Sequence, residues 1–222
     1  MRESAFSNFR QSRKNMKNKL ILLGVLTAAF FVILSLPSPA LACACCADPG
    51  AYVIDTRKVD ENFLSELKRL KFEGPGLYMT DAGDDLIKGI DPLGFDFQVT
   101  SIFQNKTFKF TFKDENGKTG ILSLPLPTTM VDFMVDIHDG KEFGAGGPAL
   151  YKEWRFKSKV GQGTGIFQKG MAPATDYFLV LQGRGNMCAT AETFTHWRLE
   201  ISGKKADYAF YGDLGKPLPD VN

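Results

Sequence analysis

The sequence has few of the residues and motifs that most often carry catalytic or metal chemistry. Among its 222 residues are two histidines, two tryptophans and four cysteines. A GxSxG motif and an HExxH motif are absent, so the common signatures of serine hydrolases and zinc proteases are missing. A second CxxC, an HxxxH pair and a histidine directly after the cysteines are absent too, which argues against a zinc finger and a c-type haem. The motifs therefore predict no catalytic residue.

Tryptophan and tyrosine are also scarce relative to phenylalanine, which supplies 19 of the 27 aromatic residues. Phenylalanine has no polar group and packs mainly in protein interiors, whereas tryptophan and tyrosine combine a ring with a hydrogen-bonding group. Sugar-binding platforms usually rely on those two residues. The aromatic composition therefore indicates a large hydrophobic core rather than an aromatic binding surface.

A long hydrophobic run occurs near the N-terminus. Residues 1–19 carry six basic residues and one acid, and residues 20–36 are apolar except for one glycine, one threonine and one serine. Two prolines and the small residues Ala40 and Ala42 follow. A charged, then apolar, then small-residue order is typical of a secretory signal peptide, which we assign to residues 1–42.

Three interpretations of this leader remain open. The first is cleavage after Ala42, and the second is lipidation of Cys43, because the segment resembles a bacterial lipobox that lacks its usual leucine. The third is an uncleaved anchor, since the 17-residue run is at the short end for crossing a bilayer. We expect an exported protein that is periplasmic, extracellular or held at the membrane by lipid on Cys43.

The charge balance changes sign once the leader is set aside. Residues 1–42 hold six of the 27 basic residues and one of the 25 acids, so residues 43–222 carry 21 basic and 24 acidic residues. Nucleic-acid binding needs clustered Lys and Arg on a basic face. We therefore expect no nucleic-acid partner, and membrane contact only through the signal segment or a lipid anchor.

Residues 43–59 are expected to form a cysteine-rich irregular head, and residues 60–222 a β-rich globular domain. Helical spacing of apolar residues follows Asp60, a suitable N-cap, and Gly74-Pro75-Gly76 is expected to end this short helix. Alternating runs on either side of Asn116-Gly117 predict a β-hairpin. Further strands are expected at 95–102, 129–137, 151–160, 177–182, 197–202 and 208–211. The pattern is mainly β and predicts a single antiparallel β-sandwich or barrel-like domain with one short N-terminal helix.

The cysteines are unevenly spaced, with Cys43, Cys45 and Cys46 close together and Cys188 far along the chain. In an oxidising compartment such cysteines are expected to form disulfides. A bridge between the adjacent Cys45 and Cys46 would be strained, which favours a long-range link from one of them to Cys188. The remaining head cysteine would pair with Cys43, carry lipid or stay free.

A metal site is the alternative interpretation of the same residues. Thiolates packed as closely as Cys43, Cys45 and Cys46 suit copper(I) or zinc, and His196 is a candidate further ligand. Thiol-redox chemistry with Cys188 is a related alternative, in which His196 would act as the base for a free Cys188 thiol.

Two weaker candidates lie at or beyond the ends of predicted strands. Asp132, Asp136 and His138 precede a glycine-rich segment, 144–147, and such a cluster can hold a divalent cation or simply form a solvated turn. The segment Gly183-Arg184-Gly185 is expected to be a turn, with Arg184 a candidate ligand for a carboxylate or phosphate.

The sequence thus predicts an exported protein that is a non-catalytic binding or structural protein of the cell envelope. The first alternative is a copper-binding, zinc-binding or thiol-redox protein that uses the cysteine cluster. The second is a hydrolase with an unrecognised site.

Overall fold

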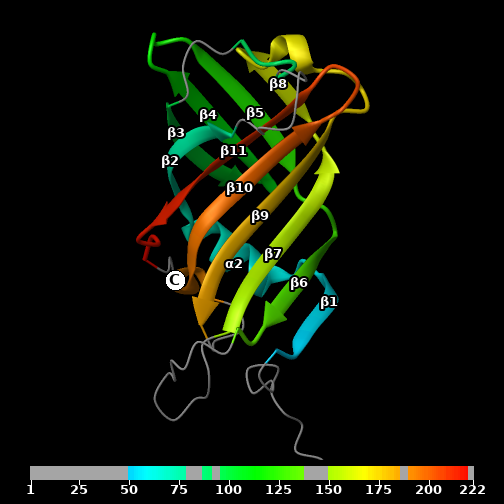
Figure 1. Ribbon diagram of the computed structural model, residues 1–222, viewed down its shortest axis with the longest axis vertical. Coiled ribbons are helices and arrows are strands. Elements are labelled where there is room, and N and C mark those ends of the chain that lie inside the picture. The colour runs from blue at the N-terminus through cyan, green and yellow to red at the C-terminus, as the bar shows by residue number, and fades with distance from the viewer. Residues whose placement is uncertain (1–49, 79–86, 92–95, 138–149, 186–189, 220–222) are drawn as a thin grey trace, which may run out of the picture. The chain divides into compact units, whose positions relative to one another are not determined.

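The computed structural model describes five segments of the chain, all within the contact unit of residues 43–222: 50–78, 87–91, 96–137, 150–185 and 190–219. These segments form two antiparallel β-sheets and one α-helix in a sandwich-like arrangement that does not close into a barrel (Figure 1). The predicted fold class, mainly β with one short helix near its start, is confirmed.

The larger sheet has seven strands, and each strand is antiparallel to its neighbours. In spatial order the strands are β1 (Tyr52–Lys58), β6 (Thr129–Val135), β7 (Leu150–Lys159), β9 (Asp176–Gly185), β10 (Phe194–Ser202), β11 (Asp207–Gly215) and β2 (Lys71–Tyr78).

The smaller sheet has four strands, in the order β3 (Phe97–Gln104), β4 (Thr107–Asp114), β5 (Thr119–Pro125) and β8 (Gln162–Gly165). It lies behind the upper part of the larger sheet in Figure 1, and the helix α2 (Glu61–Arg69) lies behind the lower part. The opposite face of the larger sheet, which we call the outer face, is turned toward the viewer.

The predicted hairpin is confirmed as β4 and β5. In β4 the side chains of Phe108, Phe110 and Phe112 are fully buried, while the residues between them are more exposed. Gly117 has a φ of +80°, a left-handed conformation that glycine adopts without steric cost. The alternation thus fixes which face of the hairpin is buried, and the turn residue allows the chain to reverse.

The core fills the space between the two sheets and the helix. Phe112 stacks on Phe210 of β11 with ring centroids 4.4 Å apart, and Phe110 packs edge-on against Phe72 of β2 at 4.8 Å. Under the helix, the Trp154 ring lies 4.9 Å from the ring of Phe63. The prediction that phenylalanine serves mainly as core is consistent with these contacts.

The helix begins at its predicted N-cap. The Asp60 side chain accepts hydrogen bonds from the backbone N–H groups of Asn62 (3.0 Å) and Phe63 (3.2 Å), as Asp does at many helix starts. The buried residues Phe63, Leu64 and Leu67 form the apolar stripe that the sequence spacing predicted. This confirms the short helix and explains its position against the sheet.

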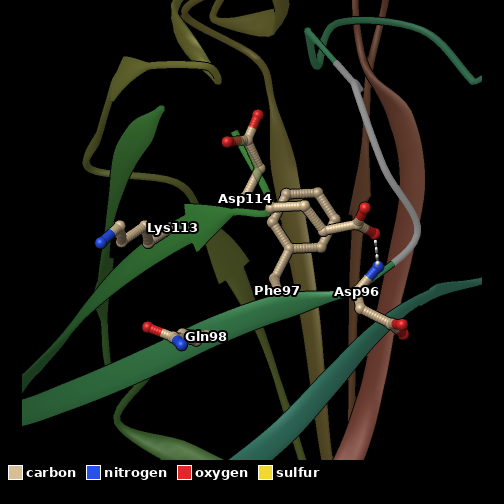
Figure 2. A pocket seen from close by; sticks show the side chains of 6 residues that line it. Asp96, Phe97, Gln98, Lys113 and Asp114 are labelled. Carbon is tan, nitrogen blue, oxygen red and sulfur yellow. Dashed lines mark hydrogen bonds between the residues drawn. The ribbon is translucent and has the colours of Figure 1, made fainter. Parts of the chain in front are cut away.

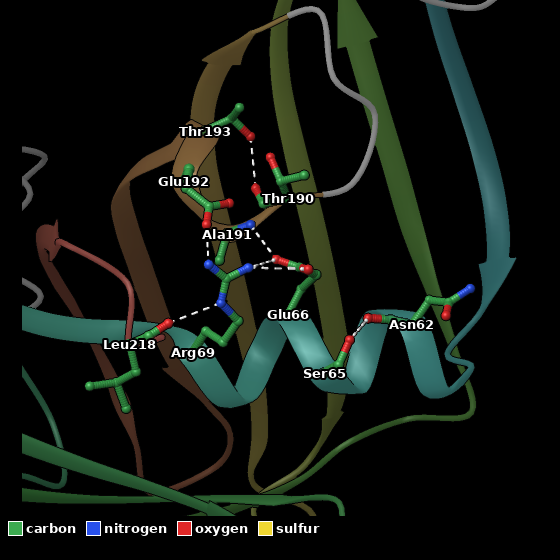
Figure 3. A network of polar contacts seen from close by, with 9 residues as sticks. All are labelled: Asn62, Ser65, Glu66, Arg69, Thr190, Ala191, Glu192, Thr193 and Leu218. Atoms are coloured by element: carbon green, nitrogen blue, oxygen red, sulfur yellow. Dashed lines mark hydrogen bonds and ion pairs between the residues drawn. The ribbon is translucent and has the colours of Figure 1, made fainter. Parts of the chain in front are cut away.

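A polar network fixes the other end of the helix (Figure 3). Arg69 forms ion pairs with Glu66 (3.0 Å) and Glu192, and its Nε donates to the Leu218 carbonyl at 3.0 Å. Glu66 also accepts a 2.6 Å hydrogen bond from the backbone N–H of Ala191, in the 3₁₀ turn η4 (Ala191–Thr193). One arginine therefore connects the helix, the turn before β10 and the C-terminal segment.

Several segments differ from the sequence-based expectation. Residues 52–58 of the expected irregular head form β1, and Gly74-Pro75-Gly76 lies within β2. Gly183 and Gly185 belong to β9 rather than to a turn. A Cβ on Gly183 would lie 1.9 Å from the Thr193 carbonyl oxygen, so this glycine permits close contact between two backbones.

Candidate functional site

The residues of the predicted cysteine site lie outside the described part of the chain: Cys43, Cys45, Cys46 and Cys188. The disulfide pairings, the lipidation of Cys43 and the copper or zinc site therefore stay predictions. His138 and the glycine-rich segment 144–147 are also outside the described residues.

His196 lies on β10, where its side chain projects from the outer face of the larger sheet and is 63% exposed. Its Nδ1 is 2.8 Å from the Thr195 hydroxyl, and its Nε2 is 3.4 Å from a carboxylate oxygen of Asp213. Because both partners of this pair are largely exposed, solvent screens the interaction and it contributes little stability. His196 is therefore a surface residue on the polar face of its strand, as the alternation predicted.

Asp132 and Asp136 do not form a joint cation site with each other. Four residues of extended chain separate their backbones by about 13 Å, and the Asp132 side chain is engaged by Arg57 inside the sandwich. Within the described segments, no three His, Cys, Asp or Glu residues are grouped closely enough to hold a metal ion. The predicted third member, His138, is not described.

The Arg57–Asp132 pair lies at the end of the sandwich that the helix covers. The Arg57 Nη1 donates a 3.0 Å hydrogen bond to Asp132 Oδ2, and the Lys152 Nζ lies 4.6 Å above the Phe194 ring. Asp132 and Lys152 are both 1% exposed. Burial raises the pKa of Asp132, and the charges of Arg57 and Lys152 offset only part of this effect. We regard this cluster as a structural feature, since bulk solvent hardly reaches Asp132 and Lys152, although the Arg57 side chain is 39% exposed.

A second polar network lies on the outer face, centred on Glu153 of β7. The Tyr151 hydroxyl and the Gln182 amide both donate to Glu153 Oε1, the amide at 3.1 Å, and the Arg155 Nε donates to Oε2. The Arg155 guanidinium lies 4.6 Å above the Phe133 ring. Glu153 is only 9% exposed, which is unusual for a carboxylate on the open face of a sheet.

The charge states of this network are fixed near neutral pH. Burial alone would raise the pKa of Glu153, but hydrogen bonds from Tyr151, Gln182 and Arg155 together outweigh it and lower the pKa. Burial, with the adjacent Glu153 carboxylate, raises the pKa of Tyr151 to about 12. Glu153 is therefore a carboxylate and Tyr151 a neutral phenol across the physiological range. Groups with such pKa values hold a geometry well but transfer protons poorly.

A shallow groove of about 350 Å³ adjoins this network on the outer face of β1, β6, β7 and β9. Its lining comprises two cations, two hydroxyls and three apolar residues: Arg155, Lys157, Thr56, Thr129, Met130, Val131 and Phe178. No acid is among these lining residues. The register places Arg155 opposite Val131 and Lys157 opposite Phe178, so the cations border an apolar surface. We call this feature the cationic groove.

Another pocket, of about 270 Å³, lies beside the β4–β5 hairpin and contains several acids (Figure 2). The Asp96 backbone N–H donates a 3.4 Å hydrogen bond to Glu115. Asp114 Oδ1 accepts hydrogen bonds from the N–H groups of Asn116 (2.9 Å) and Lys118 (2.7 Å), so this carboxylate stabilises the turn. We therefore regard this pocket as part of the hairpin structure.

Arg184 is placed differently from expectation. It is an exposed residue of β9, directly opposite Tyr151 of β7, rather than the tip of a glycine turn. It still lies on the outer face, two residues after Gln182 of the Glu153 network, where it adds a further positive charge.

Sequence reasoning missed the Glu153 network and the cationic groove. Their residues come from four strands, and Glu153 and Gln182 meet only because β7 and β9 pair in the observed register. One signal was present: the alternation of β7 places Tyr151, Glu153, Arg155 and Lys157 on the same face. That signal identifies a polar face without showing that a carboxylate is buried on it.

No protein-family model, curated protein or solved structure matches this chain. Among the helices described, none has the length and apolar character needed to cross a membrane. The geometry of the outer face is therefore the basis for the functional proposal.

Proposed function

We propose that this protein is an exported, non-catalytic binding protein of the cell envelope, and that its cationic groove binds an anionic group attached to an apolar body. Export is inferred from the leader sequence, residues 1–42. The observation that carries the binding proposal is the arrangement around Arg155, whose Nε is held by a nearly buried carboxylate beside an acid-free groove.

The Glu153 network supports binding because it orients Arg155 before any ligand arrives. Among the described residues, none accepts a hydrogen bond from the Arg155 Nη atoms, so these donors remain available to a carboxylate or phosphate. Guanidinium groups bind such anions through paired, charge-assisted hydrogen bonds. A pre-oriented side chain also loses less conformational entropy when it binds.

Lys157 and the two threonines complete a site of matching chemistry. Lys157, two residues after Arg155 on the same face of β7, has no ion pair with any described residue, so its charge is available to a ligand. Thr56 and Thr129 supply hydroxyl groups, and Val131 and Phe178 supply apolar surface. The groove therefore suits an amphipathic anion, while the fixed protonation states of Glu153 and Tyr151 favour binding over catalysis.

The test uses two small probes, phenyl phosphate and benzoate, titrated into the chain as purified from cells and followed by ¹H–¹⁵N NMR. We expect saturable shifts at Thr56, Thr129, Arg155 and Lys157, with binding that weakens as salt screens the charges. Comparing the two probes distinguishes a phosphate ligand from a carboxylate ligand.

The variants Arg155→Met and Lys157→Ala should each weaken binding of the preferred probe by about tenfold, equivalent to roughly 1.4 kcal/mol. Lys109→Ala removes an exposed lysine of β4 in the smaller sheet and should leave binding unchanged. The proposal is wrong if neither probe shifts the groove residues, or if the Lys109 variant weakens binding as much as the groove variants do.

A further inference from the structure

The free edge of the larger sheet is formed by β1, which pairs with β6 on one side and with no described strand on the other. Tyr52 and Ile54 are 66% and 58% exposed on this strand. An open edge presents backbone donors and acceptors to which another strand can add. Two properties of β1 indicate which strand fits: which of its residues direct their backbone N–H and C=O groups to the free edge, and where its charged side chains lie.

The hydrogen bonds to β6 show which residues of β1 direct their backbone groups to the free edge. The backbone N–H of Asp136 donates to the Ala51 carbonyl at 3.1 Å, and the Val59 N–H donates to the Thr128 carbonyl at 3.0 Å. Odd-numbered residues of β1 therefore direct their backbone groups toward β6. Since this direction alternates along a strand, the backbone groups of Tyr52, Ile54, Thr56 and Lys58 point to the free edge. A partner strand must hydrogen-bond with residues of this set.

We propose that β1 pairs with β1 of a second copy of this chain, antiparallel and with Thr56 on the two-fold axis. In this register Thr56 faces Thr56 and Ile54 faces Lys58 as hydrogen-bonded pairs. Asp55 then lies opposite Arg57 of the other copy, twice, in non-hydrogen-bonded pairs where side chains approach most closely. The larger sheets of the two copies become one continuous sheet.

Charge complementarity selects this register over its neighbours. A two-fold axis at residue 55 would place Asp55 opposite Asp55, and an axis at residue 57 would place Arg57 opposite Arg57, both of which are repulsive. Shifting one strand by an odd number of residues would place residues whose backbone groups point to the free edge opposite residues whose backbone groups point to β6, so the hydrogen bonds could not form. The Asp55 side chain is 61% exposed in the single copy and lies 3.6 Å from its own Arg57, so it remains accessible to a second guanidinium.

The pairing also has a geometric consequence for the outer face. Thr56 lines the cationic groove, so a two-fold axis at Thr56 brings the grooves of two copies next to each other. The dimer does not depend on the groove binding any ligand, because it is carried by the edge of β1 alone. A short strand pair buries little surface, so we expect a dimer that dissociates on dilution.

The test measures the mass of the chain purified from cells by sedimentation equilibrium over a range of concentrations. We expect a concentration-dependent dimer for the wild type and a monomer for Thr56→Pro. Proline at residue 56 removes an N–H that points to the free edge, so the ladder between β1 and β6 keeps its hydrogen bonds. Thermal unfolding of both proteins establishes that the variant is folded.

A charge variant provides a second, independent test. Asp55→Lys places like charges opposite Arg57 of the other copy and should abolish the dimer, whereas Asp207→Lys makes the same change at the start of β11 and should leave it intact. Amide hydrogen exchange of Ile54, Thr56 and Lys58 should slow as the dimer forms.

Three results would overturn the proposal. One is a monomer at every concentration in which the wild type stays soluble, and another is a Thr56→Pro variant that remains a dimer. The third is a monomer whose Ile54, Thr56 and Lys58 amides are already protected, because another part of the same chain would then cover the edge.

Discussion

Asp132 is a residue on which burial and neighbouring charges act in opposite directions. Its carboxylate is almost fully buried, one oxygen accepts from Arg57, and the other, Oδ1, has no hydrogen-bond partner among the described residues. A buried charge that loses its partner costs far more than the pair contributes while intact. Arg57 therefore matters mainly because it prevents the cost of a buried, unpaired Asp132 carboxylate. The stability that the intact ion pair adds is the smaller effect.

We expect Arg57→Met to lower the free energy of unfolding by up to about 3 kcal/mol at neutral pH, because Asp132 is left buried without its guanidinium. The penalty should shrink as the pH falls. Asp132 has a pKa above its unfolded value, so between these two values the native state binds a proton that the unfolded state does not, and stability increases toward acid. Urea unfolding at several pH values measures this dependence.

The double variant Arg57→Met with Asp132→Leu is the matched control, since it removes both charges and should recover most of the lost stability. If the single variant were equally destabilised at acid and neutral pH, the loss would come from packing around the arginine side chain rather than from the uncompensated carboxylate.

The helix illustrates how a short element depends on its ends. Nine residues form a marginal helix in isolation, so packing and capping must stabilise α2. Asp60 caps the first turn, and Lys68 and Arg69 place positive charge in the last turn, where the helix dipole favours it.

We expect Asp60→Ala to lower the free energy of unfolding by about 1 kcal/mol, because two backbone N–H groups lose their acceptor. Asp60→Ser retains a capping oxygen and should lie close to the wild type. Thermal or urea unfolding of the three proteins makes the comparison. If the serine variant were as unstable as the alanine variant, the charge of Asp60 rather than its capping hydrogen bonds would be responsible.

The sequence predicted those elements whose side chains alternate and whose turns have a defined chemistry. The hairpin around Gly117 and the strands β7, β9 and β10 were predicted because one face of each is buried. The strand β2 was missed because Gly74-Pro75-Gly76 is typical of a turn. An edge strand tolerates proline, and among the described strands β2 pairs within its sheet only with β11.

The candidate site was far less predictable than the fold. A local pattern can show that Arg155 and Lys157 share a face, but the partners of Arg155 depend on pairings between distant segments. Neither the burial of Glu153 nor the groove beside Thr56 leaves a local signature, because both arise only once four strands have taken their register.

The molecule as a whole is dominated by contacts between distant parts of the chain. β1 pairs with β6, and β2 pairs with β11, so the two edges of the larger sheet come from the first two strands of the described chain. Five strands lie between these edges: β6, β7, β9, β10 and β11. The stability of the N-terminal strands therefore depends on the C-terminal half.

We expect a chain that ends at Ser202, and so lacks β11, to lose cooperative unfolding. Its β2 strand would have no partner in the larger sheet, and Phe112 would lose its 4.4 Å stacking contact with Phe210. Circular dichroism in the near ultraviolet, together with thermal unfolding, measures this loss.

A chain that ends at Gly215 is the matched control. It keeps every described strand and loses the contacts of the last residues, which include the hydrogen bonds between Leu218 and Arg69. It should unfold cooperatively with a modest loss of stability. If both truncated chains behaved alike, the pairing of β2 with β11 would not be what completes the sheet.

The placement of the first strands at the sheet edges has a consequence for biosynthesis. A chain made from its N-terminus presents β1 and β2 long before their partners exist, and the last pairing, between β11 and β2, waits until about residue 215 has emerged. Sheets that close through such distant partners form slowly. Until synthesis is nearly complete, the larger sheet therefore lacks its closing strand pair, so hairpins such as β4–β5 can form early while the complete core cannot.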